Sequence, residues 1–180
     1  MSVGLHPGTL VVASPKLADN PHFAQRAILI LRYSADTGTA GVVINRPLDQ
    51  DHMAEHQQYL SKGLEHLRTP DNRLVFVGGP LQPHALVVLH RVEHLGVGQP
   101  LFANIYHGGD LEALRSHARS SDSEQSVLRF YLGFVSWESG QLENEVSKGF
   151  WSLSPGLADL VFSSRPDQVW QQLLSSSNGG

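Results

Sequence analysis

The chain of 180 residues contains no cysteine. This absence excludes disulfide bonds, zinc–thiolate sites, thiol nucleophiles and iron–sulfur ligation by its own side chains. Ten histidines remain as possible ligands, and His52 and His56 have the i, i+4 spacing that places two imidazoles on one helix face. The residues between them do not form the His-Glu-x-x-His zinc motif, and no third ligand lies nearby in the sequence. We therefore predict no metal and no cofactor.

The chain also lacks a concentration of positive charge. Thirteen basic residues stand against seventeen acidic ones, which gives a formal charge of −4 with neutral histidine. Clustered lysines and arginines supply most non-specific affinity for nucleic acid, so scattered arginines on an acidic chain predict no strong direct binding to DNA. The predicted partner is a small molecule or a protein.

Long hydrophobic runs are missing as well. No apolar stretch approaches the roughly 18 residues needed to span a bilayer. Residues 1–10 have no basic region followed by an apolar segment. The sequence therefore predicts no membrane span and a cytoplasmic location.

The residues that are present indicate one domain. A chain of this length, with 41% hydrophobic residues, has the size of a single domain and buries roughly 70% of its unfolded surface. No linker or internal repeat interrupts it, so we predict one domain over residues 1–174. Residues 175–180 are rich in serine and glycine and are predicted to form a disordered tail.

Apolar runs bounded by turn residues predict a series of strands. Residues 27–33 and 40–45 are separated by a five-residue, turn-rich link, which indicates two adjacent antiparallel strands. The other predicted strands are residues 9–13, 73–77, 85–90, 101–106 and 127–136.

Helical periodicity is confined to short segments. The predicted helices are residues 22–25, 51–68, 111–118, 141–148, 155–161 and 166–174. Asp110 and Ser139 are suited to cap two of them, and Gly149 is suited to end one. The strands mostly follow one another and the helices do not alternate with them, so the pattern favours the α+β class.

Three motifs place small or polar residues at the ends of apolar runs. Gly41–Leu48 (Gly-Val-Val-Ile-Asn-Arg-Pro-Leu) indicates a buried strand that stops at a proline. Val75–Pro80 ends in Gly-Gly-Pro, and Gly133–Glu143 leads from an apolar strand into an acidic helix. In this order and combination, from Gly8 to Trp151, the sequence resembles the AlgH/YqgE family of bacterial proteins.

The resemblance implies a single α+β domain with a bent, mainly antiparallel, partly barrel-like sheet surrounded by helices. It implies no established activity, although some relatives are described as transcriptional regulators. The sequence shows no helix-turn-helix reading helix and no basic stripe, so an effect on transcription would be indirect. We therefore favour a non-enzymatic binding or regulatory protein. Phe134 stands where the family usually has tyrosine, which removes that hydroxyl.

Asn45 and Arg46 are the first candidates for a ligand site. A guanidinium beside an amide can hold a planar carboxylate or phosphate. The alternative is structural, with Asn45 satisfying the backbone of a loop and Arg46 pairing with a glutamate on a helix. We predict that this segment meets the helix start at residues 141–143, with Glu143 as the partner of Arg46.

Gly78 and Gly79 can let backbone amides approach an anion. They lack the Lys-Ser/Thr ending of a P-loop and the spacing of a dinucleotide fingerprint, so a tight turn is the favoured interpretation. Trp137 is interpreted as part of the core or of a cleft wall. Gln141, at the start of the acidic helix, completes the set of candidates near it.

Glu143 and Glu145 lie early in that helix, where the helix dipole favours acids. Residues two apart on a helix point in different directions, so these carboxylates cannot share one proton. The sequence shows no catalytic residue set, and no Gly-x-Ser-x-Gly elbow. The alternative hypothesis is an enzyme of unknown reaction with a polar cleft around Asn45, Arg46, His90 and Glu143.

Overall fold

The computed structural model describes residues 2–49, 75–92, 98–119 and 127–177, and in these ranges nine strands form one sheet. The strands are β1 (Leu10–Ala13), β2 (Ala27–Ser34), β3 (Gly38–Val43), β4 (Val75–Val77), β5 (Leu81–His90), β6 (Gln99–Phe102), β7 (Ile105–His107), β8 (Leu128–Trp137) and β9 (Trp151–Ser154). The helices are the short 3-10 turn η1 (Pro15–Leu17), α2 (Leu111–Arg119), α4 (Gln141–Ser147), α5 (Ala158–Val161) and α6 (Pro166–Ser177).

The strand order is β6-β7-β5-β8-β3-β2-β1-β9, and β4 pairs with β8 beside this path. β4 runs parallel to β8, and the other described pairings are antiparallel. This mainly antiparallel sheet with a few helices confirms an α+β single domain. The described order has two ends, β6 and β9, so a partly barrel-like closure is not confirmed.

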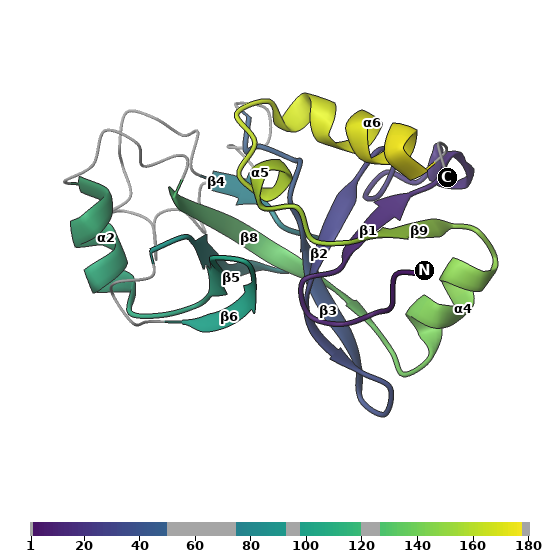
Figure 1. Cartoon of the computed structure of the whole chain (residues 1–180), viewed down its shortest axis with the longest axis horizontal. Helices are drawn as coiled ribbons and strands as arrows, with labels where there is room; N and C mark the ends of the chain where they lie inside the picture. The colour runs from purple at the N-terminus through teal and green to yellow at the C-terminus, as the bar shows by residue number, and fades with distance from the viewer. Residues whose placement is uncertain (1, 50–74, 93–97, 120–126, 178–180) are drawn as a thin grey trace.

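The long strand β8 joins the two halves of the sheet (Figure 1). Its residues up to Leu132 pair with β4 and those from Val135 pair with β3, while β5 pairs with β8 as far as Phe134. Gly133 lies between the halves with a positive φ of 74°, a conformation that glycine adopts without a steric penalty. At this glycine β8 therefore changes one of its partners, from β4 to β3, and keeps β5.

Both faces of the β1–β2–β3 region are covered. Along β1, Leu10 and Val12 belong to one core cluster, which also contains Val169 and Leu173 of α6. Val11 belongs to a second cluster on the opposite face, with Trp137, Leu142 of α4 and Trp151. Alternate residues of a strand point to opposite faces, so the uninterrupted apolar run of β1 fits burial on both sides.

The predicted hairpin of residues 27–33 and 40–45 is confirmed as β2 and β3, whose register joins Leu29 with Val42. The single strand predicted at residues 101–106 is wrong, because β6 and β7 form a hairpin there. Its turn is Ala103–Asn104, and Ala103 has a φ of 46°. The sequence offered no glycine or proline to mark this turn.

Other predictions need smaller corrections. Residues 21–25 form a turn instead of a helix, although the Asn20 side chain accepts from the amides of His22 and Phe23 as a cap does. The helix predicted at residues 155–161 is shortened to α5. α6 continues to Ser177, into the segment predicted to be a tail. The helix predicted at residues 51–68, with His52 and His56, lies outside the described residues.

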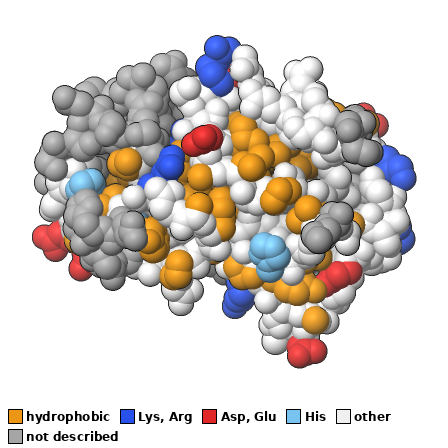
Figure 2. Space-filling view, viewed as in Figure 1, with side chains coloured by type: hydrophobic (Ala, Val, Ile, Leu, Met, Phe, Trp, Pro, Cys, Tyr) orange, Lys and Arg blue, Asp and Glu red, His pale blue; other side chains and the backbone are white. Residues whose placement is uncertain are grey.

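The face drawn in Figure 2 shows hydrophobic side chains gathered across its middle. Partly buried residues that pack against the first core cluster, such as Leu101 and Phe102, remain accessible in part. Among larger apolar side chains, Leu81 and Leu157 stay 43% exposed. Exposure of isolated apolar side chains is ordinary for globular proteins. None of the helices in the described ranges is long and apolar enough to cross a membrane.

Candidate functional site

A pocket of about 280 Å³ lies where α4, β8 and β9 meet the segment around η1. The elements α4 and β9 lie at the right-hand end of the chain as drawn in Figure 1. Most of its wall is aromatic or aliphatic, and its polar groups are two amides, a hydroxyl and one carboxylate. The lining residues are Leu17, Asn20, Phe23, Val135, Ser136, Trp137, Gln141, Glu145, Phe150 and Trp151. Apolar walls with a few convergent polar groups are typical of small-molecule sites.

Glu145 is the centre of the polar contacts in this wall. Its Oε2 accepts hydrogen bonds from the indole nitrogens of Trp137, at 3.1 Å, and Trp151, at 2.7 Å. Its Oε1 accepts one from the side-chain amide of Gln141 at 2.9 Å. Three donors from two strands and one helix thus fix the carboxylate, and hydrogen bonds to an ionised acceptor are stronger than neutral ones.

The two indoles are held rigidly. Trp137 and Trp151 are each only 4% exposed, and their rings meet nearly at right angles with centroids 5.9 Å apart. The ring of Phe23 packs edge-on against Trp151 at 5.6 Å. Such edge-to-face pairs are the favoured arrangement of aromatic rings. The wall therefore needs little reorganisation before a ligand enters.

The local sequence explains how α4 presents its side chains. Gly140 begins the helix with a φ of 74°, and Ser139, predicted to be the cap, instead donates its hydroxyl to the carbonyl of Ala35. Gln141 and Glu145 are four residues apart, so they share one face of the helix. Gly149, with a φ of 74°, follows the end of α4 as predicted.

Glu143 points elsewhere, as expected for residues two apart on a helix. Its Oε1 accepts a hydrogen bond of 2.7 Å from the hydroxyl of Tyr33 on β2. This bond is the main reason why the pKa of Tyr33 is raised. Glu143 therefore ties α4 to the β2–β3 hairpin and does not line the pocket described above.

The predicted meeting of Asn45 and Arg46 with Glu143 is wrong. Antiparallel pairing of Thr39 with Trp137 places α4, which follows β8, beside the start of β3. Asn45 lies six residues further along, roughly 20 Å at the rise of an extended strand. The two segments are therefore at opposite ends of β3.

Asn45 satisfies a loop backbone, which was the structural alternative. Its side chain is 5% exposed, accepts from the amide of Ala27 at 3.0 Å and donates to the carbonyl of Gln25 at 2.9 Å. Gln25 has a φ of 58°, which is uncommon for a residue other than glycine. Asn45 therefore holds the entry into β2.

Arg46 lies next to another arginine. It is half-buried, and its guanidinium lowers the pKa of Arg26, for which burial is the larger cause. Arg26 also donates to the carbonyl of Asn45 at 3.3 Å. The chain then runs beside β4, since the carbonyl of Arg46 accepts from Val77 and Pro47 bridges to Phe76.

Gly78 and Gly79 serve close packing between strands. A β-carbon on Gly78 would lie 2.4 Å from the carbonyl oxygen of Gly133, and one on Gly79 would lie 2.2 Å from that of Phe134. The amide of Gly78 donates to Leu132. Neither glycine lies in a turn, so the predicted tight turn is not confirmed, and the glycines instead face the backbone of β8.

His90 lies at the other half of the sheet. It is fully buried at the end of β5, its Nδ1 accepts from the amide of Val92 at 3.2 Å, and its ring stacks on Tyr106 at 5.3 Å. Because it pairs with Leu128 at the start of β8, almost the whole of that strand separates it from α4. The polar cleft of the enzyme hypothesis is therefore not assembled.

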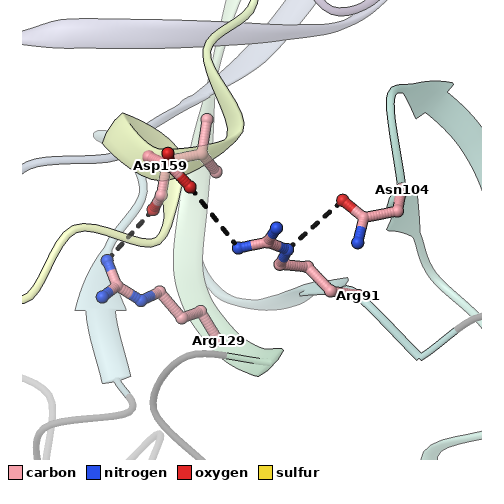
Figure 3. Close-up of polar contacts among 5 residues, drawn as sticks. Arg91, Asn104, Arg129 and Asp159 are labelled. Atoms are coloured by element: carbon pink, nitrogen blue, oxygen red, sulfur yellow. Dashed lines mark hydrogen bonds and ion pairs between the residues drawn. The ribbon is translucent and has the colours of Figure 1, made fainter.

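A cluster of polar residues near β5 and α5 was not predicted (Figure 3). Arg91 contacts Asn104 at 3.3 Å and the exposed Asp159 at 3.9 Å. The buried Arg129 donates to the carbonyls of Val161 and Ser163 at the end of α5. Its carbonyl acceptors and its burial indicate a structural role. In the described ranges, no group of three or more histidines or acids is placed to hold a metal.

Tyr131 gives this cluster a dependence on pH. Burial raises the pKa of its hydroxyl above the ordinary value of about 10, while the neighbouring Arg129 acts in the opposite direction. As pH rises, the unfolded chain therefore releases this proton before the folded chain does. The contribution of Tyr131 to the free energy of unfolding is complete below pH 10 and is lost as pH rises from there towards the folded pKa. At one unit above the unfolded pKa the loss is about 1.4 kcal/mol.

Between about pH 8 and pH 11, we expect the free energy of unfolding of wild type to fall by about 1.4 kcal/mol more than that of Tyr131→Phe. Urea unfolding at both pH values measures the difference. Equal losses in the two proteins would show that the hydroxyl ionises as easily in the folded chain.

Comparison with known proteins gives consistent matches along the chain. A family model described as AlgH-like matches residues 10–180. A UPF0301 protein of Chlamydia muridarum is 30% identical over 178 residues, which cover 97% of this chain and 88% of the relative. One of Chlamydia felis is 31% identical over 176 residues, with the same shares of coverage.

Two solved structures have a similar fold. A crystal structure of a Corynebacterium diphtheriae protein has a TM-score of 0.70 at 21% identity and covers 98% of this chain and 89% of its own. The solution structure of the AlgH protein from Pseudomonas aeruginosa has a TM-score of 0.64 at 24% identity, with coverage of 99% and 92%. At these identities the likeness concerns the fold.

Proposed function

The chain belongs to the AlgH-like family, and from that premise we propose that it is a non-enzymatic binding protein that takes a small organic ligand in the pocket beside α4. The observation that carries the proposal is the fixed carboxylate of Glu145, bonded to two indoles and an amide in a pocket wall. A preorganised wall lowers the cost of ordering side chains when a ligand binds.

A purely structural role of this cluster is the competing interpretation. The same hydrogen bonds attach α4 to β8 and β9, and they would do so in a protein without a ligand. The pocket itself favours binding, because it leaves a space of about 280 Å³ beside the bonded carboxylate. Two of the residues predicted from the sequence, Trp137 and Gln141, line it.

Regulation is the finer part of the proposal. Gln141 and Glu145 belong to α4, whose other face carries the Glu143 bond to the β2–β3 hairpin. A ligand that changes the bonds on one face of this seven-residue helix changes the surface that the helix offers a protein partner. Any effect on transcription is then indirect, and the cytoplasm is the location we propose.

The test uses substitution of Gln141 by tryptophan. Gln141 is exposed on α4 and its side-chain amide reaches Glu145 in the pocket wall, so a large ring there fills the space without entering the core. Ser147→Trp is the matched control, because Ser147 is exposed on α4 and is not among the lining residues. A mixture of small organic compounds is screened by saturation-transfer NMR against all three proteins.

We expect compounds that bind wild type and the Ser147 variant but not the Gln141 variant. A screen in which wild type binds nothing, or in which Gln141→Trp loses no compound, would overturn the proposal. Circular dichroism of both variants confirms that each has kept the fold.

A further inference from the structure

The charge of the pocket limits which ligands fit it. Of the ten residues that line it, Glu145 alone carries a formal charge at neutral pH. Within the described ranges no basic side chain forms an ion pair with it. Its three hydrogen-bond donors, two indoles and an amide, are all neutral. The wall therefore holds an uncompensated negative charge.

Lys16, which lies beside Phe150 of the pocket wall, is engaged elsewhere. Its ammonium donates to the carbonyl of Lys148 at 2.8 Å and lies 6.0 Å from the centre of the Phe150 ring. Lys16 is not among the residues that line the pocket. The positive charge that suits Glu145 would thus come from a ligand.

The carboxylate keeps capacity for one more donor. A carboxylate has about four acceptor positions, and three of those on Glu145 are occupied. Two bonds lie on Oε2 and one on Oε1, so the remaining position is on Oε1. One N–H of a charged ligand can fill it, and such charge-assisted bonds are about twice as strong as neutral ones.

The other walls suit carbon atoms attached to that charge. Phe23, Phe150, Trp151, Leu17 and Val135 give aromatic and aliphatic surface. Aromatic rings also attract cations through their negative faces, and indole does so best. Each indole here donates its N–H to the Glu145 carboxylate. This bond polarises the ring so that its face attracts a cation more strongly.

We propose that the pocket binds an organic cation: a protonated amine that has at least one N–H for Glu145 and carries an apolar carbon chain. This inference rests on the proposed function and names the class of ligand for the same site. An amine metabolite and the lysine side chain of a partner peptide share this chemistry.

The test compares three probes of equal chain length and different charge: hexylammonium, hexanol and hexanoate. Titrations followed by NMR at neutral pH give their affinities for wild type, Glu145→Gln and Glu143→Gln. The last variant is the matched control, since it removes the same charge from the same helix outside the pocket.

We expect hexylammonium to bind wild type and Glu143→Gln at least tenfold more tightly than hexanol, with hexanoate weakest. In Glu145→Gln the advantage of the cation should fall below about threefold, because the amide has no charge. If that variant does not fold, the comparison of the three probes on wild type decides the question alone. Equal affinity of wild type for all three would overturn the inference.

The failure of this inference differs from failure of the proposed function. If Gln141→Trp abolishes binding of all three probes while wild type does not distinguish their charges, the pocket binds ligands but not cations selectively. If Gln141→Trp leaves the binding of hexylammonium unchanged, both proposals fail. A lysine-containing peptide, compared with the same peptide acetylated on lysine, then separates the two sources of the amine.

Discussion

Substitution of Gly133 by alanine is expected to destabilise the protein by about 3–5 kcal/mol. The positive φ of 74° costs an alanine roughly 1–2 kcal/mol. In addition, a β-carbon there would lie 2.3 Å from the carbonyl oxygen of Gly79 and 2.9 Å from that of Leu81. Both are backbone atoms that take part in β4–β8 and β5–β8 packing, so relief requires the strands to move.

Gly140→Ala is the control for the backbone contribution. Gly140 has the same φ of 74°, and nothing lies within 4 Å of the position that its β-carbon would occupy. We expect this variant to lose only the roughly 1–2 kcal/mol of the left-handed conformation. Urea unfolding of both proteins gives the two losses, and equal losses would show that the crowding at Gly133 is relieved at no cost.

The same glycine illustrates which parts of the fold the sequence predicted. The β2–β3 hairpin is predicted by two apolar runs separated by a turn-rich link, and β8 is predicted by its own apolar run. Both predictions depend only on residues close together in the sequence. The change of partner at Gly133 does not follow from any local pattern. It depends on which strands approach β8, and that is decided by contacts far apart in the sequence.

The strand β9 was missed for a related reason. Its four residues, Trp-Ser-Leu-Ser, are too short for periodicity to identify a strand, and they pair with β1 over a separation of about 140 residues. This edge strand brings Trp151 to Glu145. Without it, the sequence contained no reason to connect Trp151 with the helix that begins at Gln141.

Part of the candidate site was nevertheless predictable. Trp137 and Gln141 were both identified as candidates, and Gln141 and Glu145 have the i, i+4 spacing that places them on one helix face. That spacing was the available signal for Glu145. The pair Glu143 and Glu145, two residues apart, carries no such signal, because these side chains leave the helix in different directions.

The wrong prediction concerns the partner of Arg46. A half-buried guanidinium and an acidic helix were expected to meet because each suits the other chemically. Antiparallel pairing of β3 with β8 separates them by most of a strand, and Glu143 bonds instead to Tyr33. Chemical complementarity does not specify a contact unless the register of the intervening strands is known.

Substitution of Arg129 is the second change expected to destabilise the protein strongly. This residue places a buried charge between β8 and α5 (Figure 3). The side chain is 4% exposed and donates to the carbonyls of Val161, at 3.0 Å, and Ser163, at 2.5 Å. Its guanidinium carbon lies 4.8 Å from the ring centre of Phe76 and 5.5 Å from that of Phe162. Burial lowers the pKa of Arg129, which shows that the charge is partly desolvated.

We expect Arg129→Met to cost about 2–4 kcal/mol. Each buried carbonyl left without its donor costs roughly 1–3 kcal/mol. The lost contacts with the two rings add to this, and relief from desolvation of the charge offsets part of it. Arg129→Lys is expected to be destabilised as well, because one ammonium does not reproduce the planar fork that reaches two carbonyls.

Arg165→Met is the matched control for this substitution. Arg165 is 63% exposed and pairs with Asp167 at 3.6 Å, a surface contact that contributes little, so we expect a change within about 0.5 kcal/mol. Urea unfolding of the three variants and wild type measures the differences. An Arg129→Met protein as stable as the Arg165 variant would mean that the end of α5 finds other donors, and that methionine packs between Phe76 and Phe162 as well as the guanidinium does.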